Sequence, residues 1–415
     1  MKNLETLINE LCPDGVEFQT MEEIFEIRNG YTPSKNNPDF WENGTIPWFR
    51  MEDIRQNGRI LSDAIQHITP AAIKGKGLFP VNSIIIATTA TIGEHALVIA
   101  DSLANQRFTN LTVRKSLTDR LLPKFVFYYM FVIDEWCKKN VNAGNFASVD
   151  MKRFKKIEFP LPPIEVQNEI VRILDKFTSL EAELEAELDC RKRQYEYYRD
   201  KLLSFENVGG QNVEWKKMSE VCEIKGRIGF RGYTRNDLVS KGEGAISMSP
   251  SNIVNGVLTF DDNTYLSWEK YEESPEIMAK VGNIVFTKTG STVGKTALIK
   301  KLPQECTINP QLVLITCTYC NNRYLTHVMQ DTRFQAQVRK FAGIGSVPNI
   351  SQKALAGILV PIPSEDEQER IANILDRFES LTTSLTAGLP AEIAARRQQY
   401  EHYRDKLLTF KRKSA

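Results

Sequence analysis

The sequence predicts an α/β or α+β multidomain protein, in which two similar globular domains alternate with two long helices that pair as an antiparallel coiled coil. Three observations lead to this prediction. One motif occurs twice in the 415 residues, each copy has the apolar spacing of a long helix, and the segments that precede the two copies resemble each other. An internal repeat of this kind also predicts a pseudo-two-fold arrangement within one chain.

The repeated motif reads FPLPPIEVQNEIVRILDKF at 159–177 and VPIPSEDEQERIANILDRF at 360–378, an offset of 201 residues. Further on, QYEYYRDKLLSF at 194–205 matches QYEHYRDKLLTF at 399–410, an offset of 205 residues. The second copy therefore has four extra residues between its matching ends. Four residues are close to one helical turn, so the apolar stripe of the helix can stay in phase.

Each copy of the motif is predicted to form a long helix of about 39 residues, which would span roughly 60 Å. The Pro-x-Pro pair favours extended backbone just before the helix, and Ser364 followed by Glu367 predicts a capping box at the second start. Gly388 and Pro390 predict a kink or break in the second helix. Apolar residues at steps of three, four or seven are the candidates for helix pairing and partner contact. They are Ile170, Leu174, Phe177, Leu184, Leu188, Tyr195, Tyr198, Leu202, Ile371, Leu375, Phe378, Tyr400, Tyr403 and Leu407.

The segments between the helices mix short β-branched runs with turn residues and short helical periods, which is typical of α/β and α+β domains. They also align with each other, as IIIATTATIGEHALV at 84–98 does with IVFTKTGSTVGKTALI at 284–299. The predicted order is an N-terminal helical segment at 1–15, a first domain at 16–162, a long helix at 163–207, a second domain at 208–363 and a long helix at 364–415.

The composition predicts a cytoplasmic globular protein. Hydrophobic residues make up 42% of the chain and charged residues 25%, and no run of about 18 apolar residues predicts a membrane span. The N-terminus has no apolar signal core, and an odd number of cysteines, seven, argues against a disulfide framework. The net charge is +1, but residues 16–164 carry 18 basic and 16 acidic residues, and residues 206–364 carry 18 and 14. Both domains are therefore mildly basic, an imbalance that a duplex-binding surface would explain but that chance explains equally well.

The motifs that suggest chemistry are better explained by structure. Gly290 and Gly294, followed by Lys295, resemble a phosphate loop, but three residues separate the glycines where that loop needs four. Cys317 and Cys320 form a single C-x-x-C without further ligands nearby, so ordinary thiols are expected. We recognise no nucleophile elbow, metal-binding motif or glycine-rich cofactor loop. The sequence therefore predicts no catalytic site, no metal site and no cofactor in this chain.

The duplicated motif, the domain–helix order, NGYTPSKNNPDFWENGTIPWFRMEDI at 29–54 and NSIIIATTATIG at 82–93 resemble the specificity subunit of type I restriction-modification systems. The resemblance covers essentially the whole chain. It implies a non-catalytic subunit whose two target recognition domains each bind one half of a bipartite sequence in double-stranded DNA, while the helices act as a ruler. It also implies two modification subunits that methylate adenine with S-adenosylmethionine, with or without two restriction subunits that use ATP and Mg²⁺.

Two alternatives stay open at this point. A methyltransferase or nuclease fused to recognition domains would show cofactor-dependent activity as a purified chain. A coiled-coil adaptor for other proteins would show no sequence preference on duplex DNA, even with a methyltransferase partner present.

Polar and basic loop residues are the candidates for DNA contact, because Arg and Lys bind phosphates or guanine while Asn and Gln can bind adenine. A single such residue is more often a solvated surface charge, so the loops are assigned as groups. In the first domain they are Tyr31, Ser34, Lys35, Arg50, Arg55, Lys74, Lys76, Thr88, Thr89 and Arg107. In the second domain they are Arg227, Arg231, Tyr233, Arg235, Lys288, Thr289, Ser291, Lys295 and Arg339.

Overall fold

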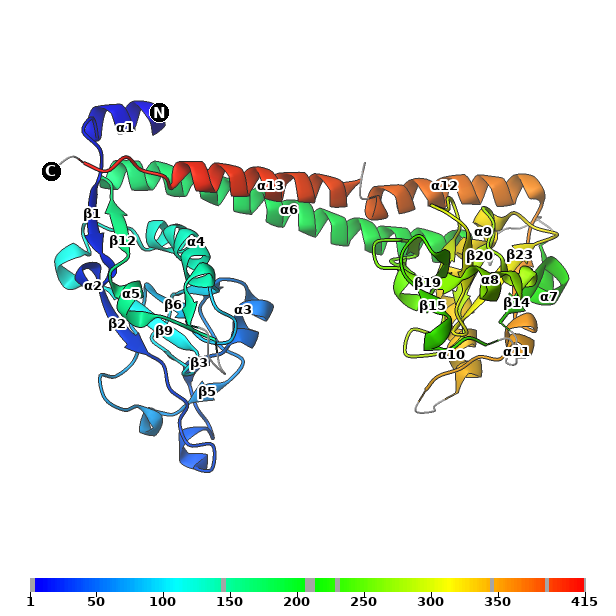
Figure 1. Ribbon diagram of the computed structural model, residues 1–415, viewed down its shortest axis with the longest axis horizontal. Helices are drawn as coiled ribbons and strands as arrows, with labels where there is room; N and C mark the ends of the chain where they lie inside the picture. The colour runs from blue at the N-terminus through cyan, green and yellow to red at the C-terminus, as the bar shows by residue number, and fades with distance from the viewer. Residues whose placement is uncertain are drawn as a thin grey trace. The chain divides into compact units, whose positions relative to one another are not determined.

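The computed structural model divides the chain into two compact units (Figure 1). Unit 1 comprises Met1–Ala182 and Ala395–Ala415, and unit 2 comprises Glu183–Ala394. The structure describes residues 4–142, 147–205, 213–227, 232–343, 347–384 and 388–413. Unit 1 thus combines the N-terminal part of the chain with its C-terminal end.

Unit 1 is built on a five-stranded sheet in the order β2-β9-β6-β7-β4. These strands are Phe25–Asn29, Phe108–Val113, Ser83–Ala87, His95–Val98 and Ile60–Leu61. A three-stranded sheet in the order β5-β3-β8 joins His67–Ile68, Ile46–Phe49 and Leu103–Ala104. Two pairs of strands complete the unit: β1 (Glu17–Thr20) with β12 (Glu158–Leu161), and β10 (Val141–Asn142) with β11 (Ser148–Val149).

The helices of unit 1 cover these sheets and supply much of the core. They are α1 (Leu4–Leu11), α2 (Met21–Ile24), α3 (Met51–Asn57), α4 (Pro123–Lys139) and α5 (Met151–Lys155). Helix α4 buries six consecutive residues, Phe125–Met130, against the strands and the start of the long helix. Trp48 and Phe49 of β3 are buried and belong to a second core cluster.

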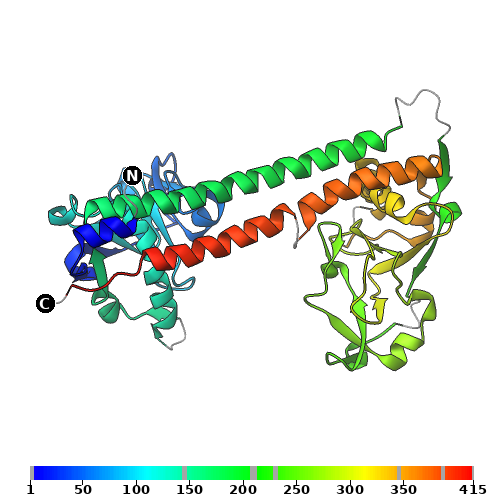
Figure 2. The same cartoon turned by 90° about the horizontal axis from the view of Figure 1, so that it is seen from above.

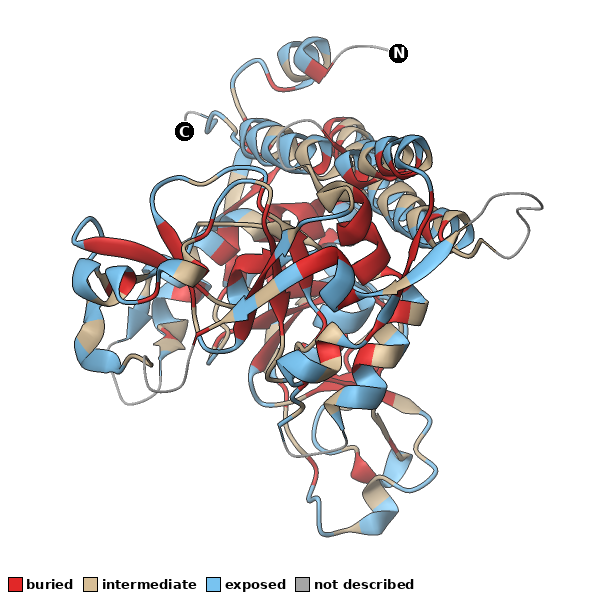
Figure 3. Ribbon diagram, turned by 90° about the vertical axis from the view of Figure 1, so that its right-hand side faces the viewer, coloured by how far each residue is buried: buried red, intermediate tan, exposed pale blue. Residues whose placement is uncertain are grey.

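Unit 2 repeats this plan with two four-stranded sheets, in the orders β14-β23-β20-β21 and β15-β19-β16-β22. The first contains Cys222–Gly226, Leu312–Cys317, Ile284–Thr287 and Thr296–Leu298. The second contains Leu238–Val239, Thr264–Ser267, Gly244–Met248 and Cys306–Ile308. The remaining elements are β13 (Glu214–Lys217), β24 (Leu359–Ile362), β17 (Ile253–Val254), β18 (Val257–Leu258), α7 (Met218–Val221), α8 (Trp268–Glu272), α9 (Asn322–Gln330), α10 (Thr332–Ala342) and α11 (Gln352–Ala356). In Figure 3 the buried residues gather in the strands and in the helix faces turned to them.

The two units share one strand register, which confirms the predicted repeat. In unit 1, Ile84 of β6 pairs with Leu111 of β9, and in unit 2, Ile284 of β20 pairs with Ile315 of β23. The segments 84–98 and 284–299, aligned by sequence, form antiparallel pairs β6–β7 and β20–β21 around a turn. The Gly-rich segment before Lys295 is thus a strand-to-strand turn, the structural role that its spacing predicted.

The first long helix, α6, runs without a break from Ile164 to Leu202. The second helical region consists of two helices, α12 (Glu365–Thr383) and α13 (Leu389–Leu407). The predicted break near 388–390 therefore coincides with the start of α13. Residues 385–387 lie outside the described residues.

One local expectation is wrong. Ser364 is the N-cap of α12, but its side chain makes no capping hydrogen bond. The Glu367 carboxylate instead accepts two hydrogen bonds from the guanidinium of Arg370, one turn further on. The charged partner outcompetes the N-cap residue for this carboxylate because a paired guanidinium forms stronger hydrogen bonds than a backbone amide.

All seven cysteines are free. Within the described residues, the structure holds no helix suited to crossing a membrane and no group of three or more His, Cys, Asp or Glu side chains arranged for a metal ion.

Candidate DNA interface and helix-pairing surface

Helices pair antiparallel within each unit (Figure 2). In unit 1, Phe177 of α6 stacks on Tyr403 of α13, with ring centroids 5.6 Å apart and planes at 25°. In unit 2, Tyr198 of α6 stacks on Phe378 of α12 with the same distance and angle. Phe177 and Phe378 are equivalent in the repeat, as are Tyr198 and Tyr403. The pairing surface is therefore duplicated with its geometry intact.

The other predicted stripe residues divide into two groups. Ile170, Leu174, Ile371 and Leu375 are fully buried and belong to the cores of their units, where they contact the domains as well as the helices. Leu184, Leu188, Tyr195, Leu202, Tyr400 and Leu407 are partly buried. The start of each motif thus anchors a long helix to its domain, and the later part faces the neighbouring helix.

A buried glutamine at each helix start explains part of the repeated motif. The Gln167 side chain accepts a hydrogen bond from the Leu122 amide and donates to the carbonyls of Arg120 and Pro162. Gln368 in unit 2 accepts from the Asn321 amide and donates to the Pro363 carbonyl. Both side chains satisfy backbone groups just before α4 or α9 that burial would otherwise leave without partners. The glutamines fix the entry of each domain helix against the long helix.

A repeated aspartate forms the second tie between domain and helix. Asp175 of α6 accepts hydrogen bonds from the Lys124 ammonium and the Tyr128 hydroxyl, both at 2.6 Å. Asp376 of α12 is bonded to the Arg323 guanidinium at 2.6 Å and to the His327 ring at 2.8 Å. The carboxylate is retained in the two units, while the partners on α4 and α9 differ.

Asp376 is expected to make unit 2 sensitive to acid. Burial raises the pKa of its carboxyl, but the hydrogen bonds from His327 and Arg323 outweigh burial and lower the pKa to about 2. The pKa of Asp376 in the folded state lies below its unfolded value of about 3.9, so the ionised carboxylate stabilises the folded unit. This stabilisation is complete above pH 4 and is lost as the pH falls through 2. We expect it to be about 2 kcal/mol. Urea denaturation between pH 5 and 2 would measure it.

The matched variant is Asp376→Asn, which keeps the shape of the side chain and removes its titration. It should lower the stability of unit 2 at pH 5 and lose less stability than the natural protein between pH 4 and 2. Equal losses in the two proteins would contradict the assignment.

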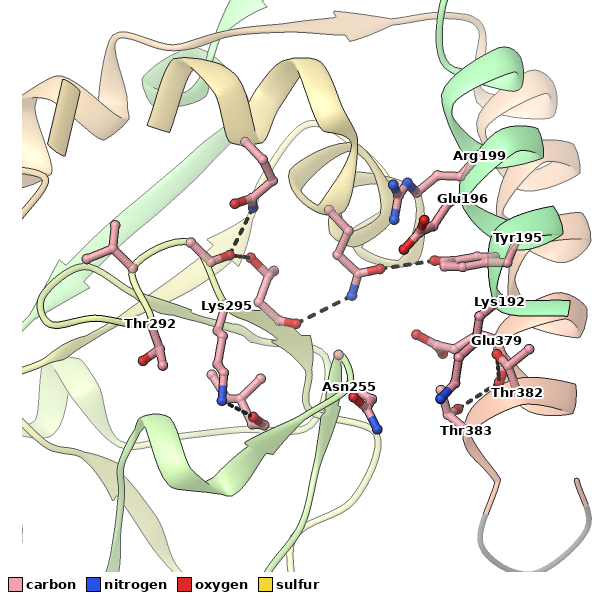
Figure 4. Close-up of a pocket in the computed structure, with 17 residues that line it drawn as sticks. Lys192, Tyr195, Glu196, Arg199, Asn255, Thr292, Lys295, Glu379, Thr382 and Thr383 are labelled. Atoms are coloured by element: carbon pink, nitrogen blue, oxygen red, sulfur yellow. Dashed lines mark hydrogen bonds between the residues drawn. The ribbon is translucent and has the colours of Figure 1, made fainter. Parts of the chain in front are cut away.

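Each unit has an open groove beside its strand turn, lined by α6 and α12 in unit 2 and by α4 and α13 in unit 1. The groove of unit 2, about 500 Å³, is lined by Glu196 and Arg199 of α6, Glu379 of α12 and Lys295 of the β20–β21 turn (Figure 4). The groove of unit 1, about 790 Å³, is lined by Glu401 and Arg404 of α13 and by Glu94 of the β6–β7 turn. Glu196 and Arg199 are the repeat equivalents of Glu401 and Arg404. The two grooves thus share an equivalent glutamate and arginine and differ in charge at the turn.

The predicted DNA-contact residues of unit 1 lie in different environments. Thr88 is buried, with its hydroxyl 3.0 Å from that of Thr109. Tyr31 donates to the Ala72 carbonyl and accepts from the Lys74 amide, so it holds the 72–74 loop in place. Arg50, Thr89 and Tyr31 are partly buried, and the exposed members are Ser34, Lys35, Arg55, Lys74, Lys76 and Arg107.

In unit 2, Arg227 is buried and donates to the Ile308 carbonyl and the Thr307 hydroxyl. Its guanidinium lies over the ring of Tyr233, whose hydroxyl is 2.8 Å from that of Ser247. Arg231 lies outside the described residues. Lys288 and Thr289 are partly buried, and the exposed members are Arg235, Ser291, Lys295 and Arg339. DNA contact stays a prediction for these residues, and the exposed ones are its candidates.

A duplicated α/β domain, with matching strand register, helix ties and aromatic stacks in both copies, defines the class: an internally repeated two-domain protein. The family model of the type I restriction modification DNA specificity domain matches residues 13–189 and 211–395. The chain belongs to this family and contains its domain twice, which confirms the resemblance found in the sequence.

Relatives of known family are type I specificity subunits as well. The chain is 39% identical over 390 residues to the type I restriction enzyme EcoprrI specificity subunit of Escherichia coli, with 91% of each chain covered. It is 34% identical over 306 residues to the EcoR124I/EcoR124II specificity subunit of the same organism, with 70% and 72% covered. A solved chain from a study of complex assembly and conformational transition of the type I R-M system has the same fold, with a TM-score of 0.61 at 16% identity, covering 95% and 98%. The chain is thus a specificity subunit rather than an enzyme.

Proposed function

We propose that each unit binds one half of a bipartite sequence in double-stranded DNA and that the helices set the number of base pairs between the halves. The most direct support is that the same DNA specificity domain matches both halves of the chain. Each unit also has a hydrophobic core of its own. Two similar domains with different loops are suited to binding two different short DNA sequences. A continuous helix, α6, supplies a spacer of fixed length.

The helices also dock two modification subunits, which methylate adenine in the bound sequence. Two features support this part of the proposal. The aromatic stacks have equal geometry in both units, and the grooves of both units include an equivalent glutamate and arginine. A chain with two equivalent surfaces is suited to two copies of one partner.

The test is to map N6-methyladenine in bacterial DNA with the chain and its modification subunit expressed together, and again without the chain. The expected result is one bipartite motif, with two constant words at a fixed gap, that disappears when the chain is absent. A motif made of one uninterrupted word, or methylation that does not depend on the chain, would exclude the proposal. The chain alone serves as the control and is expected to methylate nothing.

A further inference from the structure

Two short turns occupy equivalent positions in the two units and expose different side chains. In unit 1, residues 105–107 link β8 to β9, and in unit 2, residues 309–311 link β22 to β23. The turns are Asn-Gln-Arg and Asn-Pro-Gln. Arg107 and Gln311 are both exposed at the last position. We call them the 105–107 turn and the 309–311 turn.

The same hydrogen bonds hold both turns. The Asn105 side chain accepts from the Arg107 amide at 3.0 Å, and the Asn309 side chain accepts from the Gln311 amide at 3.0 Å. The backbone amide of Asn105 donates to the Phe49 carbonyl of β3, and the backbone amide of Asn309 donates to the Met248 carbonyl of β16. The backbone that presents the two exposed side chains is therefore rigid and alike in both units.

Each turn also supports the neighbouring strand turn. The Arg107 carbonyl accepts from the Thr88 amide at 3.0 Å, and the Gln311 carbonyl accepts from the Lys288 amide at 2.9 Å. The β6–β7 and β20–β21 turns, which supply several candidate DNA contacts, thus lie directly beside them. In unit 2, the Thr289 hydroxyl also donates to the side-chain oxygen of Asn349 at 2.6 Å. Arg107 is itself one of the residues predicted to contact DNA, and Gln311 lies beside two others, Lys288 and Thr289.

Their side chains are available for an outside partner. Among the described residues, the structure gives the Arg107 guanidinium no hydrogen-bond or ion-pair partner. The side-chain oxygen of Gln311, Oε1, accepts one hydrogen bond, from the Asn309 side-chain amide at 3.2 Å. An arginine forms paired hydrogen bonds with O6 and N7 of guanine, and a glutamine does so with N6 and N7 of adenine.

We propose that Arg107 and Gln311 are equivalent base-reading residues, with Arg107 selecting a guanine in the half-site of unit 1 and Gln311 an adenine in the half-site of unit 2. The inference rests on the proposed function, because it assumes that each unit reads one half-site. It adds which residues discriminate between the two words and which bases they select.

The test compares the methylated motifs of Arg107→Gln and Gln311→Arg with that of the natural chain, each co-expressed with the modification subunit. Arg107→Gln should change one guanine to adenine in one half-site, and Gln311→Arg should change one adenine to guanine in the other. The preference for the original base should fall by about 10- to 100-fold at that position. The double variant keeps the net charge and should show both changes.

Two further variants keep the result interpretable. Arg107→Ala should make the same position degenerate while the rest of the half-site is retained, even if glutamine does not fit there. Lys115→Gln removes an equal charge from an exposed residue beyond the other end of β9 and should leave the motif unchanged.

An unchanged motif in Arg107→Gln, Gln311→Arg and Arg107→Ala would overturn the inference, as would a uniform loss of methylation at all sites with the motif intact, which is the result for a phosphate contact. A bipartite motif from the natural chain separates this failure from failure of the proposed function, which would leave no bipartite motif in any sample.

Discussion

Deleting Glu183–Ala186 from α6 is expected to shorten the gap between the two half-sites by about two base pairs. Four helical residues span about 6 Å, and stacked base pairs are about 3.4 Å apart. The four residues lie at the boundary of the two units, inside a helix that is unbroken from Ile164 to Leu202. Four residues are also nearly one turn, so Leu188 would take the place of Leu184 in the pairing stripe. Mapping methylated adenines in cells that express the deleted chain would measure the new gap.

The control for this deletion changes the same segment without changing its length. Glu183→Ala combined with Glu185→Ala removes two exposed charges and keeps good helix-forming residues, so the original gap should persist. If the deleted chain directs methylation to the original sequence with the original gap, the helix does not measure distance in this protein.

Truncating the aromatic stacks is expected to destabilise each unit to a similar extent. Phe177 and Phe378 are partly buried, so Phe177→Ala should lower the free energy of unfolding of unit 1 by about 2 kcal/mol, and Phe378→Ala should do the same in unit 2. The values should match because the two stacks have the same centroid distance and interplanar angle. Since the two residues share no partner, the double variant should show both losses. Urea denaturation of the three variants would measure these energies.

Phe177→Leu and Phe378→Leu are the matched variants. They retain apolar volume and lose the ring, so each should cost less than the corresponding alanine variant. A loss of less than about 1 kcal/mol for either alanine variant would show that the stack contributes little beyond surface contact.

The sequence predicted the helices well because their signals are local. The period of apolar residues and the Pro-x-Pro starts are properties of neighbouring residues, and α6 and α12 begin where they indicated. The function of Gln167 was missed, although the glutamine is part of the repeated motif. Its partners Arg120 and Leu122 are 47 and 45 residues away in the chain. No local pattern indicates a hydrogen bond of that range.

The candidate DNA contacts also show that sequence alone does not determine which polar loop residues are buried. Thr88 and Arg227 are polar loop residues by sequence, but the fold buries both and uses their polar groups internally. Arg107 has the same signature and stays exposed. Gln311 carried no signal of its own, because only the superposable hydrogen bonds of the two turns relate it to Arg107.

The sequence by itself determined the family, the internal repeat and the order of domains and helices. These follow from residue identities and spacings, which a chain displays whether folded or not. The tertiary structure alone decided which loop side chains face solvent and which tie a domain to its helix, including Asp175 and Asp376 with their different partners. The environment of a side chain is set by segments distant in sequence, and these meet only when the chain is folded.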